Sequence, residues 1–341
     1  MVTPTTPPRS KYRATWNSPT GTVVRNALVL GGSTSRPTTS QDHANIQPER
    51  VDVFQIPSVA FQHLLEDNDL KKFTCDPAKA ALGQMNVDKS ACGVGTFKTA
   101  HRAWLTLTHL SAGGLGTEPN ELVAAKRLFA ERRNKVRDGQ RVDTQVIKRL
   151  ASTPEHGKIM MEATVLMWSD SLFEFSYDFV SHKVKDATTE PPFPIPPMQY
   201  VHSAVAVVRG DTGSSTIMRT YLLEEFIDPH LDGFYKYISN GSAVPVAAVM
   251  EDNVLAWIAK FLSALQHVQY WKTGGMAYVS DLQGYTLTAF YRDIPGGSSL
   301  FGDGNVGTAF AKFSQEHVCN KLCQWLELPQ LDVEEDEEDD Q

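Results

Sequence analysis

The chain has 341 residues, 41% of them hydrophobic, and a formal net charge of −8. That length suggests one large or two modest domains with a real core. Eight acidic residues lie between Asp332 and Gln341, and without them the formal charge is zero. No basic stripe is present to complement phosphates, which excludes nucleic acid as the main partner.

Signals for membranes and secretion are missing as well. No run approaches the roughly 18 apolar residues that span a bilayer, and the N-terminal residues lack the apolar core of a secretory signal. The four cysteines (Cys75, Cys92, Cys319 and Cys323) are too few for a disulfide scaffold. We therefore expect an intracellular, cytoplasmic protein that binds no membrane.

Three segments are predicted along the chain. Residues 1–50 are rich in Thr, Ser and Pro and predict a mostly disordered arm. A globular domain is expected over 51–330. The acidic residues at 331–341 predict a disordered, solvated tail that can bind a partner.

The first half of the domain predicts strands followed by one long helix. A strand pair with a glycine turn is expected near 92–110, and a second glycine-rich turn at 111–120 precedes a short apolar strand at 122–125. Apolar residues at steps of three and four predict a helix over 143–182. The proline-dense stretch 189–200 ends that helix.

The second half predicts a hairpin over 203–227, a helix over 254–268, a hairpin over 276–291 that turns at Gly284, and a last helix over 308–326. This order predicts a two-lobed α+β fold. A doubly wound sheet is less compatible, because it needs regular alternation of strands and helices.

A metal motif is suggested by His317, Cys319 and Cys323. On a helix the two cysteines share a face, and with the histidine they suit tetrahedral zinc, which needs a fourth ligand. His267, in the segment ALQHVQYW, is the best candidate for that ligand. By spacing alone the alternative stays open, in which the cysteines and His267 are core residues and His317 lies on the surface.

The segment GDGNVG, residues 302–307, matches the pattern of a dinucleotide-binding turn. Only 34 residues follow it, without a second strand, so the dinucleotide interpretation fails. A loop that approaches a ligand and an ordinary surface turn remain as alternatives.

Lys126 ends an apolar strand, where an ammonium can reach phosphate oxygens, and the glycine turn CGVGTF can cover them with backbone N–H groups. Asp281 and Gln283 lie two apart on a predicted strand and would point the same way, as a base and a metal ligand for phosphoryl transfer do. A solvent-facing lysine and a capped hairpin are the alternatives.

Seven segments, in order, resemble the alpha-kinases, the atypical protein kinases that include myosin heavy chain kinases and the elongation-factor kinase: CGVGTFKTAHRAWLTL, LVAAKR, YLLEEFI, FYKYISN, FLSALQHVQYWKTGGMAYVSDLQG, LFGDGNVG and HVCNKLC. The resemblance covers about 85–330 and is closest to the fungal branch. It implies a kinase-like N-lobe over about 51–222 and a zinc-stapled C-lobe over about 223–330.

The resemblance also assigns roles to single residues. It implies ATP, Mg²⁺ and a protein substrate, with Asp281 as the catalytic aspartate and Gln283 as a magnesium ligand. The nucleotide-binding residues it implies are Lys126 at the phosphates, Glu224 at the adenine, Lys236 and Asn240. Gly93 and Gly95 of the glycine turn CGVGTF are added to this set from their own pattern. The glycines of the substrate loop are Gly302, Gly304 and Gly307. The four ligands of a structural zinc are His267, His317, Cys319 and Cys323.

One position departs from the family pattern. The family places a magnesium-binding aspartate where this chain has Ala289, and an alanine cannot coordinate a metal. Asp293 is the nearby carboxylate that can substitute for it. The sequence therefore predicts an ATP-dependent serine/threonine kinase, with a catalytically impaired pseudokinase that acts as a nucleotide-binding or scaffold module as the alternative.

Overall fold

The computed structural model describes residues 48–95, 97–137, 140–210, 216–227, 235–239, 241–283, 288–291 and 312–331, with only the backbone described at 131–137, 140–146, 283 and 288–291. The predicted arm before residue 48, the glycine loop at 302–307 and the acidic tail from Asp332 lie outside these residues.

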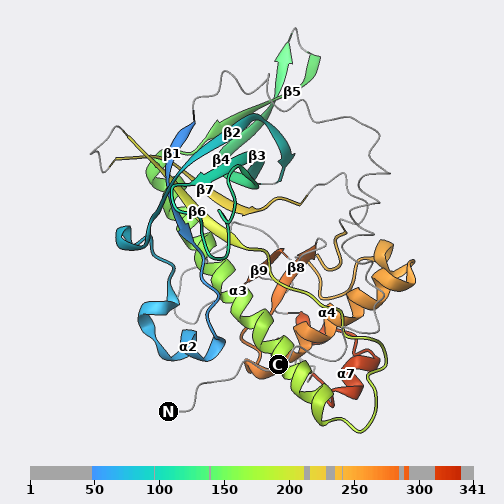
Figure 1. Ribbon diagram of the computed structural model, residues 1–341. Coiled ribbons are helices and arrows are strands. Elements are labelled where there is room, and N and C mark those ends of the chain that lie inside the picture. The colour runs from blue at the N-terminus through green and yellow to red at the C-terminus, as the bar shows by residue number, and fades with distance from the viewer. Residues whose placement is uncertain are drawn as a thin grey trace, which may run out of the picture. The chain divides into compact units, whose positions relative to one another are not determined.

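Seven antiparallel strands form one sheet in the order β3-β2-β1-β6-β7-β4-β5 (Figure 1). Because β3 also pairs with β4, the first six strands of that order close on themselves. The strands are β1 Glu49–Gln55, β2 Ala81–Val94, β3 Lys98–Leu107, β4 Glu121–Arg137, β5 Gln140–Arg149, β6 Ser203–Arg209 and β7 Ile217–Glu225.

The strand sequences explain this closure. In β3 every second residue, from Thr99 to Leu107, is buried, which is the period-two pattern of a strand with one covered face. Strand β6 is buried on both faces and is accordingly a nearly continuous apolar run. Its Ala204 and Ala206 belong to the core inside the closed sheet, whereas Val205 and Val207 belong to the larger core outside it.

The larger core is organised around α3, Ser152–Asp186, which contacts β7 and β6 and continues to α4 (Figure 1). Leu166, Leu172 and Phe173 of this helix are buried. The helix ends at Asp186, before the prolines, as the sequence predicts.

The C-terminal part consists of α4 Asn253–Lys272, the hairpin β8 Val279–Gln283 and β9 Thr288–Tyr291, and the short helices α6 Phe313–Glu316 and α7 Lys321–Trp325. The remaining elements are α2 Phe61–Glu66 and the 3₁₀ turns η2 Asn68–Lys71, η3 Pro77–Lys79 and η4 Ala247–Met250. Within the described part of the chain, no helix combines the length and the apolar character needed to cross a bilayer.

Two expectations for the first half of the domain were wrong. The helix predicted from residue 143 begins at Ser152, because 140–149 form β5 instead. The strand predicted at 122–125 continues to Arg137, and this extension is the part of β4 that pairs with β5. The β-branched residues Val142, Val146 and Ile147 favour such a strand once a partner is present.

The prediction of one last helix over 308–326 was also wrong for the residues that the structure describes. This part of the chain consists of two short helices separated by His317–Asn320, which is not helical. The Asn320 side chain accepts hydrogen bonds from the backbone N–H groups of Leu322 and Cys323, so it caps a new helix start. Cys319 therefore precedes α7, and the two cysteines do not share a helix face.

Candidate active site and metal cluster

An ion pair joins two neighbouring strands of the closed sheet. Nζ of Lys126 in β4 lies 2.5 Å from Oε2 of Glu224 in β7. The Glu224 side chain is 7% exposed, so its carboxylate needs this partner. The structure thus brings together two residues that the sequence assigned separately to the phosphates and the adenine.

A second lysine lies beside this pair. Nζ of Lys98, at the start of β3, donates a hydrogen bond to the Glu162 carboxylate of α3. Burial lowers the pKa of Lys98 to about 7; the Lys126 ammonium adds to this effect, and Glu224 and Asp281 oppose it. The contact with Glu162 favours the charged form as well. Burial is the largest of these effects, so the net shift of the Lys98 pKa is downward.

The predicted catalytic aspartate is also paired. Oδ1 of Asp281 in β8 lies 2.5 Å from Nζ of Lys236, and the Asp281 side chain is 12% exposed. The backbone φ of Asp281 is 57°, in the left-handed region that residues with side chains seldom adopt. The carboxylates of Asp281 and Glu224 both act to raise the pKa of Lys98, so the β8 hairpin and the sheet each contribute a negative charge to the surroundings of this lysine.

Lys98 and Glu162 were not among the site residues predicted from the sequence. Lys98 directly follows the predicted glycine turn, and on the adjacent strand its register partner Leu128 is two residues from Lys126. The position of Lys98 directly after the turn was the available signal for a second phosphate-facing lysine, whereas the strand register is known from the structure. Glu162 carried none, because its contact with Lys98 depends on where α3 lies relative to the closed sheet.

Several predicted site residues are only partly described. Gly93 lies in β2 opposite Ala100, and the N–H of Gly95 donates to the Lys98 carbonyl, closing the turn. Gln283 ends β8, but a register shift between Ser280 and Gln283 interrupts the alternation from which we expected it to point with Asp281. Asn240, Asp293 and the three loop glycines lie outside the described residues.

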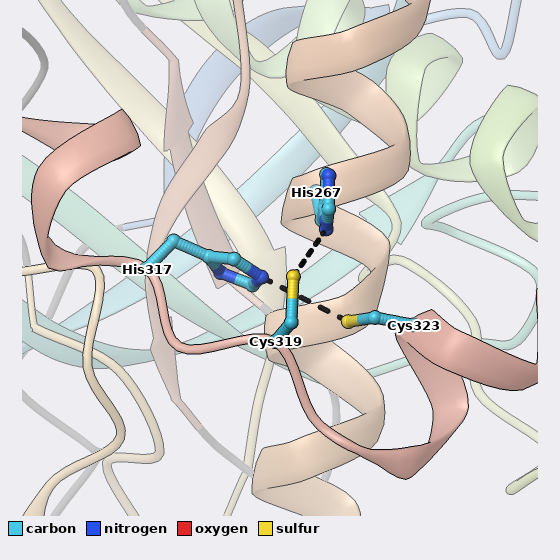
Figure 2. Close-up of side chains that lie close together, drawn as sticks. All are labelled: His267, His317, Cys319 and Cys323. Atoms are coloured by element: carbon cyan, nitrogen blue, oxygen red, sulfur yellow. Dashed lines mark hydrogen bonds between the residues drawn. The ribbon is translucent and has the colours of Figure 1, made fainter. Parts of the chain in front are cut away.

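A separate cluster joins α4 to the chain around α7 (Figure 2). It consists of His267, His317, Cys319 and Cys323, whose ligand atoms all lie within 4.8 Å of one another. Sγ of Cys319 lies 3.6 Å from Nδ1 of His267, and Sγ of Cys323 lies 3.8 Å from Nε2 of His317. Two nitrogens and two sulfurs at these separations match the edges of a tetrahedral zinc site.

The surroundings of the cluster suit a metal. Nδ1 of His317 lies 3.5 Å from Oγ of Ser263, a contact that orients the ring. Burial lowers the pKa of His317 to about 4, with His267 adding to the effect, so the imidazole is neutral as a ligand must be. Burial raises the pKa of Cys323 to about 12, so a metal would have to displace its proton.

The closed antiparallel sheet and the helical C-terminal part together form a mixed α+β fold. The model of the alpha-kinase family matches residues 120–323, which is more than half of the chain, so the chain belongs to this family. Membership confirms that the seven segments identify an alpha-kinase domain. A comparison with curated proteins found no matching relative.

Solved structures of the alpha-kinase domain of myosin-II heavy chain kinase A have the same fold. The complex of that domain with adenosine is 15% identical, covers 84% of this chain and 96% of its own, and has a TM-score of 0.52. The complex with AMP is 16% identical, covers 83% of this chain and 100% of its own, and has a TM-score of 0.51. A C-terminally truncated form of the alpha-kinase domain of myosin heavy chain kinase is 15% identical, covers 83% of this chain and 99% of its own, and has a TM-score of 0.51.

Proposed function

We propose that this chain is an ATP-dependent serine/threonine protein kinase of the alpha-kinase type, from the fungal branch of the family. The observation that carries the proposal is the gathering of charged residues at one site. Lys126 is paired with Glu224, Lys98 lies on the adjacent strand with a register partner two residues from Lys126, and Lys236 is paired with Asp281. Phosphoryl transfer depends on such positioned cations and one carboxylate.

The lysines of the sheet are proposed to bind the ATP phosphates. Lys126 is held by Glu224, so a phosphate oxygen has to compete with that carboxylate for one ammonium group. We expect nucleotide binding to open this pair and to leave Glu224 near the adenine. The turn with Gly93 and Gly95 would then lie over the phosphates and offer them those backbone N–H groups that are not bonded within the turn, as the Gly95 N–H is, with Asn240 as a further contact.

Asp281 is proposed to orient the substrate hydroxyl and to accept its proton. Lys236, 2.5 Å away, holds the carboxylate in place and adds positive charge near the phosphates. Mg²⁺ bound with ATP would neutralise charge between the phosphates, and Gln283 and Asp293 are the residues proposed to hold it. The loop with Gly302, Gly304 and Gly307 is proposed to contact the protein substrate.

The His267, His317, Cys319 and Cys323 cluster is proposed to hold one structural Zn²⁺. All four tetrahedral positions would be filled by protein atoms, so no position is left for a reacting water. The ion would fasten the chain around α7 to α4.

An ATP-turnover assay tests the kinase proposal. Purified protein is incubated with labelled ATP, with and without Mg²⁺, and with basic and acidic Ser/Thr substrates. Asp281→Ala is the control, because it removes the proposed catalytic carboxylate. We expect transfer to serine or threonine that requires Mg²⁺ and falls at least a hundredfold in the control. Transfer that is no greater than in the control would refute the proposal.

A second candidate is a pseudokinase that binds nucleotide without transferring phosphate. Ala289 favours it, since the family has a magnesium-binding aspartate at this position. In β9 the neighbouring Phe290 is the register partner of Ser280, which precedes Asp281. This candidate predicts nucleotide affinity that Mg²⁺ does not change, measured by calorimetry with and without the ion.

A further inference from the structure

We propose that Gln266 and Gln269 of α4, the glutamine pair, are positioning residues that hold the catalytic Asp281 in its reactive conformation. This inference rests on the proposed kinase function. Both side chains are buried, with 0% and 1% exposure, and they lie on either side of His267. Buried amides are costly unless they are hydrogen-bonded, and among the polar atoms of these two side chains Oε1 of Gln266 is the one without a hydrogen-bond partner in the described part of the chain.

The glutamine pair bonds both backbone polar groups of one residue in β8. Nε2 of Gln266 donates to the carbonyl of Val279 at 2.7 Å, and Oε1 of Gln269 accepts from the N–H of Val279 at 2.8 Å. Nε2 of Gln269 also donates to Oγ of Ser176 in α3 at 3.0 Å. Val279 is therefore fixed to two helices, two residues before Asp281.

Sheet pairing gives Asp281 little support by itself. Among the described strands β8 pairs with β9, and that pairing is irregular between Ser280 and Gln283. On the far side of Asp281, the carbonyl of Leu282 accepts hydrogen bonds from the N–H groups of Tyr237 at 2.8 Å and Ile238 at 3.2 Å. Asp281 is thus held between two fixed residues, Val279 and Leu282.

This support matters because Asp281 has a φ of 57°. Aspartate adopts the left-handed conformation more readily than most residues with a side chain, but the conformation still costs free energy that the surrounding bonds have to offset. Without the bonds at Val279, we expect the backbone to relax toward an ordinary φ. The carboxylate would then turn away from Lys236 and from the substrate hydroxyl.

The expected effect is selective. Lys98, Lys126 and Glu224 lie on the closed sheet and α3 holds Lys98, so the proposed nucleotide contacts there do not depend on Val279. A misplaced carboxylate slows the chemical step, since small errors in geometry cost large factors in rate. A merely structural role would not separate turnover from nucleotide affinity.

The test uses Gln266→Met and Gln269→Met in the full chain, which keep an unbranched side chain of similar length and remove the hydrogen bonds. The matched control is Thr164→Val, which removes a buried side-chain bond of 3.1 Å to the N–H of Phe73, away from Asp281. We expect kcat to fall at least tenfold in both methionine variants, with the Kd for ATP within threefold of the wild-type value. In the Thr164→Val control, both kcat and the Kd for ATP should stay within twofold of the wild-type values.

Two measurements separate this inference from the kinase proposal. Gln269→Glu keeps an acceptor for the Val279 N–H and should retain at least three times the kcat of Gln269→Met. Hydrogen exchange of the peptide 277–283 should be at least tenfold faster in the methionine variants than in Thr164→Val, whether or not the protein is active. Wild-type protein without transfer would refute the proposed function. Active methionine variants with unchanged kcat, or with unchanged exchange, would overturn the positioning inference alone.

Discussion

The ammonium of Lys236 lies 2.5 Å from Oδ1 of Asp281, so the proposed catalytic carboxylate is already paired with a cation before any ligand is considered. The two side chains differ in exposure, at 43% for Lys236 and 12% for Asp281. The lysine can therefore exchange partners with solvent or phosphate more easily than the aspartate can. This asymmetry makes Lys236 the movable member of the pair.

Lys236→Met should reduce kcat at least tenfold. The variant leaves a mostly buried carboxylate without its cation and removes a positive charge from the proposed phosphate site. Lys236→Arg keeps the charge and should retain more activity than Lys236→Met. Steady-state kinetics over a range of ATP concentrations measure both effects. A methionine variant with wild-type kcat would show that the ion pair has no part in the reaction.

Lys98 should make stability depend on pH. Its pKa is about 7 in the folded protein, against an ordinary value of 10.5, so between these values the unfolded chain binds more protons. The contribution of Lys98 to stability therefore increases as pH rises from about 7 toward 10. Relative to Lys98→Met, the wild-type protein should gain on the order of 1–2 kcal/mol between pH 7 and pH 9.

Urea unfolding of both proteins at the two pH values measures this gain. Lys79→Met is the control, because Lys79 is exposed and should give no pH-dependent difference. If the difference between wild type and Lys98→Met stays constant with pH, then Glu162 keeps Lys98 charged and the downward pKa shift is wrong.

Much of the fold can be predicted from local patterns. The β6–β7 hairpin, the β8–β9 hairpin, α4 and the end of α3 at the prolines all follow from periodicity and from proline. The start of α3 cannot, because residues 143–149 contain both helical spacing and β-branched side chains. Pairing with the extended part of β4 decides the outcome, and that contact is tertiary.

The site can be predicted less completely. Spacing alone proposed three zinc ligands and a candidate fourth, and the cluster places all four together. Lys126 and Glu224 are 98 positions apart, so only the family resemblance put them in one site. The Lys98–Glu162 contact could not be predicted, because it depends on where α3 lies relative to the closed sheet.

Metal analysis should find about one zinc per chain, and Cys323→Ser should lower stability by on the order of 3–5 kcal/mol. The Cys323 side chain is buried, so loss of the metal would leave polar groups without partners between α4 and α7. Cys92→Ser is the control, since Cys92 is exposed and lies outside the cluster. A metal-free protein as stable as the zinc-loaded one would argue against the site.

Ala289→Asp should increase magnesium-dependent turnover at least tenfold. The change restores a carboxylate in β9, next to Phe290, whose register partner Ser280 precedes Asp281. An additional oxygen ligand there would hold Mg²⁺ more firmly against the phosphates. The measurement is kcat as a function of Mg²⁺ concentration, with Ala289→Asn as the control because it adds an amide of similar size without the charge.

The outcomes at position 289 separate the two proposed functions. A wild-type protein without activity that gains it in Ala289→Asp is a pseudokinase limited by its metal site. An active wild-type protein that is unchanged by the substitution must hold Mg²⁺ through another carboxylate, and Asp293→Asn should then abolish its activity. If Asp293→Asn also leaves turnover intact, neither residue is the missing ligand and the proposed magnesium site is wrong.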